Sequence, residues 1–246
     1  MFNVPPVVLA TLGALVLVHV ARVYLLSPRD DVQFLLLFSF IPARYDAALL
    51  TQGGVPGGWA AEIWTFVTYA FIHADFTHLA LNSIWLLAFG SAVARRFGAL
   101  RFIAFFIVTA AAGAGMHLLT HAGDYFPVVG ASAAISGFMA AAIRFVFQRG
   151  GPLGALGSAG REAYREPAAP LLVILRDPRV LVFLAVWFGL NVLFGIGSVS
   201  IADDQQSVAW QAHIGGFLAG LLLFPLFDPV APSGPGERLE REALRH

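Results

Sequence analysis

The sequence predicts an all-α membrane protein in which six transmembrane helices form one bundle. Of its 246 residues, 58% are hydrophobic and only 12% are charged, whereas a soluble domain carries about 25% charged residues. A spanning helix needs about 20 mostly apolar residues. Six long windows contain no Asp, Glu, Lys or Arg: residues 1–21, 76–94, 102–123, 125–143, 180–202 and 205–227. This composition argues against a soluble enzyme and a disordered chain.

The charge balance and the absence of cysteine exclude several kinds of site. The formal net charge is zero, so we expect no nucleic-acid partner, because nothing attracts the chain to polyanions in bulk. All basic residues are arginines, and there is no cysteine for a disulfide or a thiolate metal site.

The N-terminal half begins with one span and a long loop. Residues 1–21 lack the basic stretch of a secretory signal, so we interpret them as a retained first span. The first loop extends over about residues 27–75. Within it, residues 32–43 are expected to lie at or partly in the membrane interface. Residues 47–61 contain four glycines and a proline and cannot form a regular spanning helix.

The arginines predict the orientation of the bundle. Twelve of them fall in the loops after spans two and four or in the tail: Arg95, Arg96, Arg101, Arg144, Arg149, Arg161, Arg165, Arg176, Arg179, Arg238, Arg241 and Arg245. The positive-inside rule places these segments, and both termini, in the cytoplasm. We therefore expect one membrane domain over residues 1–227, with a cytoplasmic loop at 149–178 and a mobile polar tail at 228–246.

Four polar side chains lie in three of the predicted spans. His78 and Asn82 share one face of span two, Ser132 opens span four, and His213 lies about eight residues into the last window. These three spans all begin at the extracytoplasmic side, so the four residues fall at similar depth. The neighbouring small residues allow close helix approach: Gly130, Ala131, Ala212, Gly215, Gly216, Ala219 and Gly220.

This combination of side chains fits nucleophilic catalysis. A serine becomes a nucleophile when an imidazole about 3 Å away accepts its proton. The oxyanion that forms needs donors, which His78, Asn82 and the Ser132 backbone N–H can supply, with the positive end of the helix assisting. No acidic residue within the spans is placed to orient the imidazole, so the pattern predicts a Ser–His dyad. Each residue taken alone also fits a structural hydrogen bond between or within helices.

Other polar residues have simpler interpretations. His19 and His121 lie near window ends, where an imidazole reaches interfacial water. His117 and His121 are spaced i, i+4, but two nitrogens without a third ligand make a weak metal site, and no metal is expected. Ser136, one turn after Ser132, is a rival nucleophile that lies deeper in the helix.

The ordered motifs resemble those of rhomboid intramembrane serine proteases of the bacterial six-span type. The matching stretches run from about residue 60 to 222: residues 64–73 leading into His78 and Asn82, Gly90, then Gly130-Ala131-Ser132, then residues 212–216 with Gly220. Each motif is weak alone, but the set occurs in the family's order and in the corresponding spans.

The resemblance implies a role for each matching residue. Ser132 is the expected nucleophile, His213 the general base, and His78 and Asn82 line the oxyanion hole with the Ser132 N–H. Gly130 and Gly216 support the site, and the segment containing His73 braces the first loop. No metal or organic cofactor is implied, and the oligomeric state stays open.

The resemblance also implies the substrate and the membrane. Single-span membrane proteins are expected to be cut at a small residue near the outer face, after local unwinding. They would enter beside span five, which carries Phe183, Trp187 and Phe188. The expected location is the plasma (inner) membrane of a bacterial-type cell.

Two departures and two alternatives remain. Ala133 replaces the glycine common after the nucleophile, and its methyl is expected to crowd the packing against span six. Pro42-Ala43-Arg44-Tyr45 replaces a Trp-Arg pair in the first loop. The alternatives are a catalytically inactive rhomboid-like scaffold and a small-solute transporter, although no repeat or intramembrane charge supports the transporter. The usual metalloprotease is excluded because HExxH is missing.

Overall fold

The computed structural model describes residues 4–46, 48, 54–148, 150–154, 160–195 and 209–231. In these ranges the secondary structure is helical except for one isolated β-bridge between Phe40 and Val128. The elements in order are α1 (Pro6–Leu25), α2 (Pro28–Phe38), η1 (Pro42–Tyr45), α4 (Gly58–Thr68), η2 (Tyr69–Phe71), α5 (Phe76–Trp85), η3 (Leu86–Gly90), α6 (Ser91–Phe97), α7 (Ala99–Thr120), α8 (Ser132–Ile143), η4 (Arg161–Tyr164), α9 (Leu171–Ile174), α10 (Pro178–Gly195) and α11 (Trp210–Phe227).

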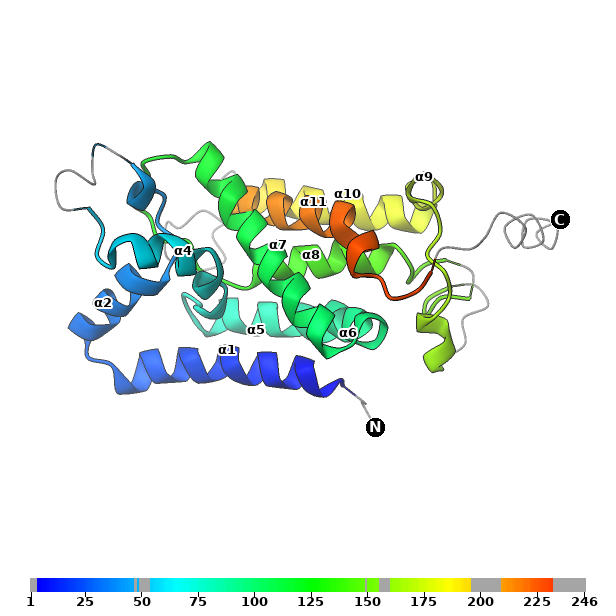
Figure 1. Cartoon of the computed structure of the whole chain (residues 1–246), viewed down its shortest axis with the longest axis horizontal. Helices are drawn as coiled ribbons and strands as arrows, with labels where there is room; N and C mark the ends of the chain where they lie inside the picture. The colour runs from blue at the N-terminus through cyan, green and yellow to red at the C-terminus, as the bar shows by residue number, and fades with distance from the viewer. Residues whose placement is uncertain are drawn as a thin grey trace.

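The helices form an elongated bundle (Figure 1). The start of α1 and the end of α11 lie at one end of it, and α2 and α4 lie at the other. Four stretches are long and apolar enough to cross a membrane: α1, the continuous helix Phe76–Phe97, α7 and α11. Two shorter apolar helices, Ser132–Ile143 and Pro178–Leu193, complete the set. The predicted all-helical membrane bundle is confirmed, although parts of the windows 180–202 and 205–227 lie outside the described residues.

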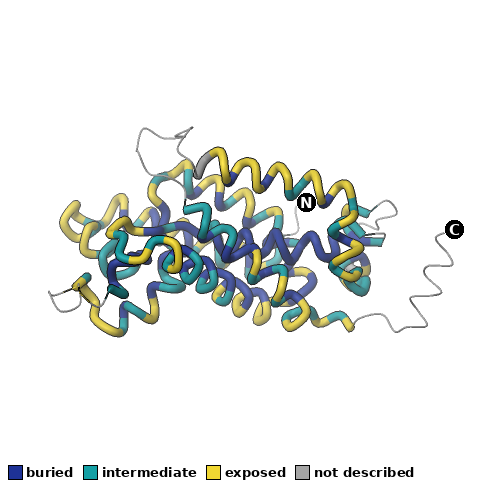
Figure 2. The backbone as a smooth tube through the Cα atoms, turned by 90° about the horizontal axis from the view of Figure 1, so that it is seen from above, coloured by how far each residue is buried: buried dark blue, intermediate teal, exposed yellow. Residues whose placement is uncertain are grey.

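The fourth predicted span is helical only in its second half. The window 125–143 begins with turns and extended chain, and α8 covers only Ser132–Ile143. Every residue of α8 after Ser132 is buried, and Figure 2 shows such residues along the inside of the bundle. A non-helical backbone is tolerated at this depth where protein supplies its hydrogen bonds. The charge-free window 125–143 is therefore wider than the helix, which begins at Ser132, the residue that opens the predicted fourth span.

The helices α7, α8 and α11 pack against one another more extensively than any other elements. Glycines make this packing possible: a Cβ at Gly216 would overlap the Ala133 backbone, and one at Gly220 would overlap the backbone of Gly137. The Ala133 methyl was expected to crowd span six, but it faces α7, where a Cβ at Gly113 would lie 2.5 Å from it. Glycine at position 113 leaves the space that this methyl occupies.

Replacing Gly220 by Ala should destabilise the bundle, because the added methyl meets the Gly137 backbone rather than a movable side chain. Overpacking of this kind costs about 1–3 kcal/mol. The measurement is the midpoint of thermal unfolding in detergent micelles. Gly115→Ala is the matched control, since nothing lies within 4 Å of a Cβ there. Equal midpoints for the two variants would contradict the packing described for α8 and α11.

The first loop is held together by hydrogen bonds to its own carbonyl groups. The guanidinium of Arg44, buried in η1, donates to the carbonyls of Leu36 and Pro56. Trp64 Nε1 on α4 donates to Leu37 O on α2 at 2.8 Å. The structure thus resolves residues 28–38 as helix α2 and residues 58–68 as α4, while residues 47 and 49–53 lie outside the described part. The interfacial location of residues 32–43 stays a prediction.

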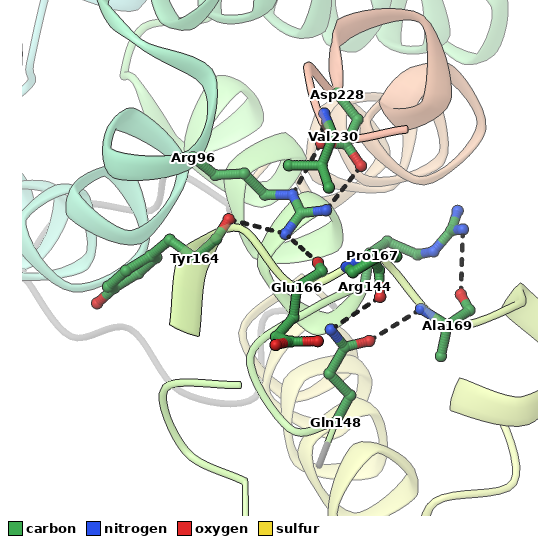
Figure 3. A network of polar contacts seen from close by, with 9 residues as sticks. All are labelled: Arg96, Arg144, Gln148, Tyr164, Glu166, Pro167, Ala169, Asp228 and Val230. Atoms are coloured by element: carbon green, nitrogen blue, oxygen red, sulfur yellow. Dashed lines mark hydrogen bonds and ion pairs between the residues drawn. The ribbon is translucent and has the colours of Figure 1, made fainter. Parts of the chain in front are cut away.

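A charged network ties the opposite end of the bundle together (Figure 3). Arg96 at the end of α6 forms two hydrogen bonds with the Asp228 carboxylate after α11, at 2.9 and 2.8 Å. It also donates to the carbonyls of Tyr164 and Glu166 at 3.0 and 2.9 Å. Neither the Arg96 nor the Asp228 side chain is more than 7% exposed. The pair therefore joins the ends of two helices to the connecting segment.

Removing one partner of this pair should destabilise the protein more than removing both. A buried charge left without its partner costs about 3–5 kcal/mol. We expect Arg96→Met and Asp228→Ala each to lower the unfolding midpoint, and the double variant to unfold at a higher midpoint than either single variant. A double-mutant cycle by thermal or denaturant unfolding measures this coupling. Strict additivity would contradict a direct ion pair.

Candidate active site

Ser132 and His213 meet between α8 and α11. His213 Nε2 on α11 lies 2.7 Å from Ser132 Oγ at the start of α8, which is hydrogen-bond distance. The two residues are separated by 81 positions in the chain. The structure thus brings together the two side chains that the sequence assigned as nucleophile and base.

The segment before Ser132 is fixed by residues of the first loop and of η2. The backbones of Phe40 and Val128 exchange two hydrogen bonds of 3.1 and 2.8 Å, and Gly130 N donates to Tyr69 O at 3.0 Å. Gly130 has φ of +116°, a conformation that favours glycine. The turn at Gly130 lets α8 begin at Ser132, so the first backbone N–H groups of the helix have no partner within it.

His78 lies against this turn. A Cβ at Gly130 would be 2.7 Å from His78 Nε2 and 3.7 Å from Ser132 Oγ, so glycine leaves the space in which the imidazole sits. The Asp75 side chain caps α5 by accepting from His78 N at 2.8 Å. A long contact of 3.5 Å from Ala74 N to His78 Nδ1 favours the tautomer with the proton on Nε2, the nitrogen beside Gly130.

Asn82 lies one turn further along the same face of α5. It is 5% exposed, and its Nδ2 donates to His78 O at 3.0 Å. The amide carries two N–H groups, so one stays available for a further acceptor. Its position beside His78 follows the predicted i, i+4 spacing.

His73 and its neighbours connect α1 to the start of α5. His73 O accepts from Arg22 at 2.9 Å and lies 3.2 Å from His19 Nδ1. Arg22 also pairs with Asp31 at 2.7 Å. Burial lowers the pKa of His73 to about 3, so this imidazole is neutral at physiological pH. Its ring packs edge-on against that of His78, with ring centroids 5.1 Å apart, so His73 touches the site through His78.

Asn191 on α10 is the residue that the sequence analysis missed. Its Oδ1 lies 2.6 Å from His213 Nδ1, and its Nδ2 donates to Trp187 O at 2.8 Å. An acidic residue was the expected orienting group, and none lies within the predicted spans. An amide in the middle of the apolar window 180–202 was the available signal, since a buried polar group in a span needs a partner.

The remaining candidates take structural positions. Ser136 Oγ donates to Ser132 O at 2.7 Å, so this hydroxyl bonds to its own helix. The rings of His117 and His121 stack with centroids 4.4 Å apart. Within the described ranges, no three or more His, Cys, Asp or Glu side chains form a group that could hold a metal ion.

Comparison with known proteins assigns the family. The Rhomboid domain matches residues 60–228, a range that includes Ser132, His213 and Asn191, and the chain belongs to this family. It is a multi-pass membrane protein. It is 25% identical over 193 residues to RHOMBOID-like protein 5 of Arabidopsis thaliana, covering 75% of this chain and 53% of that protein. The chain thus spans about half the length of this relative.

Gly130→Ala should slow the reaction of Ser132 with a fluorophosphonate probe by at least about tenfold, because the methyl displaces His78. Labelling is measured by gel fluorescence and mass spectrometry. Gly98→Ala is the matched control: its φ is +76°, yet nothing lies within 4 Å of the added Cβ. Both glycines have positive φ, so an added side chain strains the backbone in both variants, and only Gly130→Ala also displaces His78. Equal labelling rates would show that the space at Gly130 does not serve the site.

Proposed function

We propose that this protein is an intramembrane serine endopeptidase that cuts single-span membrane proteins. The observation that carries the proposal is the 2.7 Å contact between Ser132 Oγ and His213 Nε2. Membership of the rhomboid family supports the same reaction class. Family membership is shared by active enzymes and inactive relatives, so the contact between the Ser132 hydroxyl and the His213 imidazole is the stronger argument.

The proposed reaction proceeds in two stages. Ser132 Oγ attacks the scissile carbonyl carbon while its proton passes to His213 Nε2. The tetrahedral intermediate collapses as the C–N bond breaks, and His213 returns the proton to the leaving amine. A water then gives a proton to His213 Nε2 and attacks the acyl ester. The ester bond breaks, His213 returns this proton to Ser132 Oγ, and the new carboxyl end of the substrate is released.

The oxyanion of each intermediate needs preorganised donors. The open N–H groups at the start of α8 supply one kind, and His78 Nε2, next to Gly130, supplies another. Asn82 adds an amide on the same face as His78. Losing one such donor lowers the rate by about 100- to 1000-fold.

The position of the site in the bundle supports cleavage near the outer membrane face. Ser132 lies at the start of α8, whereas Arg96, Arg144 and Arg179 lie at the end of α6, the end of α8 and the start of α10. The positive-inside rule assigns the end of the bundle that carries these three arginines to the cytoplasm. We therefore propose that the protein lies in a bacterial-type inner membrane with both termini in the cytoplasm. We also propose one membrane domain over residues 1–227 followed by a polar tail at 228–246. Residues 232–246 of this tail lie outside the described residues.

Ser132→Ala should abolish cleavage of a labelled single-span substrate by the purified protein. The loss is expected to exceed about 1000-fold, because the hydroxyl forms the covalent bond. His213→Ala should lose both cleavage and fluorophosphonate labelling. Fragments are counted by gel electrophoresis, with Ser136→Ala as the matched control that retains activity. Persistent cleavage in Ser132→Ala would overturn the nucleophile, and an inactive wild type that does not label would favour a scaffold.

A further inference from the structure

We infer that Asn191 is a positioning residue that holds the catalytic imidazole in one tautomer and one orientation. The inference rests on the proposed function, and it extends the predicted dyad to a hydrogen-bonded chain of Ser132, His213 and Asn191. The Asn191 side chain is buried, with 8% of the residue exposed. It lies 2.6 Å from His213 Nδ1, on the ring edge opposite Ser132.

The direction of each hydrogen bond follows from the backbone. The carbonyl of Trp187 can only accept, so the Asn191 atom 2.8 Å from it must be the NH₂ group. The amide oxygen then faces His213 Nδ1 and can only accept. Therefore Nδ1 carries the proton, and Nε2 is left with the free lone pair that faces Ser132 Oγ. A backbone carbonyl on α10 thus sets the protonation pattern at the nucleophile.

Packing of α10 against α11 holds Asn191 in place. Trp187, one turn before Asn191, stacks on Phe217 of α11 with ring centroids 4.5 Å apart. Phe217 lies one turn after His213, so the aromatic pair and the amide–imidazole pair join the same two helices. Phe188 of α10 also contacts Phe217, with ring centroids 6.0 Å apart, so two aromatic side chains near Asn191 hold α10 against α11.

An amide suits this position better than a carboxylate would. A buried charge inside a membrane bundle is costly. A carboxylate at position 191 would also place one of its oxygens against the carbonyl oxygen of Trp187, and the two oxygens would repel each other. The neutral amide satisfies both neighbours without a net charge. It orients the imidazole as the acid does in a Ser-His-Asp triad, but it supplies less stabilisation to the imidazolium.

Two substitutions separate this role from simple packing. Asn191→Leu keeps a similar volume and removes the acceptor, so kcat should fall about 10- to 100-fold with KM nearly unchanged. Asn191→Asp restores the oxygen facing Nδ1, and in its protonated form it also donates to Trp187 O. We expect this variant to retain most of the wild-type kcat. Leu190→Ala is the control on α10, because Leu190 is 42% exposed, and its kcat should not change.

The tautomer can be measured without any turnover. In protein labelled with ¹⁵N-histidine, the ring signals of His213, assigned by their loss in His213→Gln, should report a proton on Nδ1. In Asn191→Leu they should shift to a mixture of tautomers. The inference would be overturned if Asn191→Leu kept the wild-type kcat, raised only KM or left the tautomer unchanged. It would also be overturned if Asn191→Asp lost as much activity as Asn191→Leu. If wild type and Ser132→Ala both fail to cleave, the proposed function fails, while the ¹⁵N signals still decide the role of Asn191.

Discussion

The close contact between α8 and α11 is the constraint on which the rest of the structure depends. Gly216 and Gly220 let the backbone of α11 approach that of α8, and no side chain separates them there. This approach carries His213 to Ser132. In a membrane, helices gain little from hiding apolar surface from water, so such association depends on close packing and hydrogen bonds. The glycines therefore contribute to the bundle and to its site at the same time.

Burial of α8 explains why Ser132, the proposed nucleophile, lies at the start of a helix. A helix that faced lipid along its whole length would need about 20 residues to satisfy its backbone. Because α8 is surrounded by protein, residues 125–131 can stay non-helical and take their hydrogen bonds from Phe40 and Tyr69. The first loop, far from the site in sequence, thereby determines where Ser132 and its open N–H groups lie.

The sequence predicted the parts of this structure that depend on local pattern. Apolar windows located most of the helices, and Ser132 and His213, assigned to different spans, lie 2.7 Å apart in the structure. The sequence placed Ser132 at the opening of the fourth span, and Pro127 and Gly130 just before it disfavour a regular helix there. Hydropathy did not show that Phe40 and Tyr69 supply the hydrogen bonds of this segment. Asn191 was missed for a related reason: its role depends on a contact with His213 on another helix, 22 positions away.

The absence of cysteine from the chain allows a direct test of whether Ser132 is an activated group in water. Ser132→Cys creates a single thiol, and its rate of reaction with a charged methanethiosulfonate reagent can be measured in membranes. An adjacent imidazole favours the reactive thiolate, so Ser132→Cys should react much faster than Ser136→Cys, and His213→Ala should slow it. A thiol at position 132 that reacts no faster than one at position 136, or whose rate does not depend on His213, would contradict the proposed activation of residue 132 by the His213 imidazole.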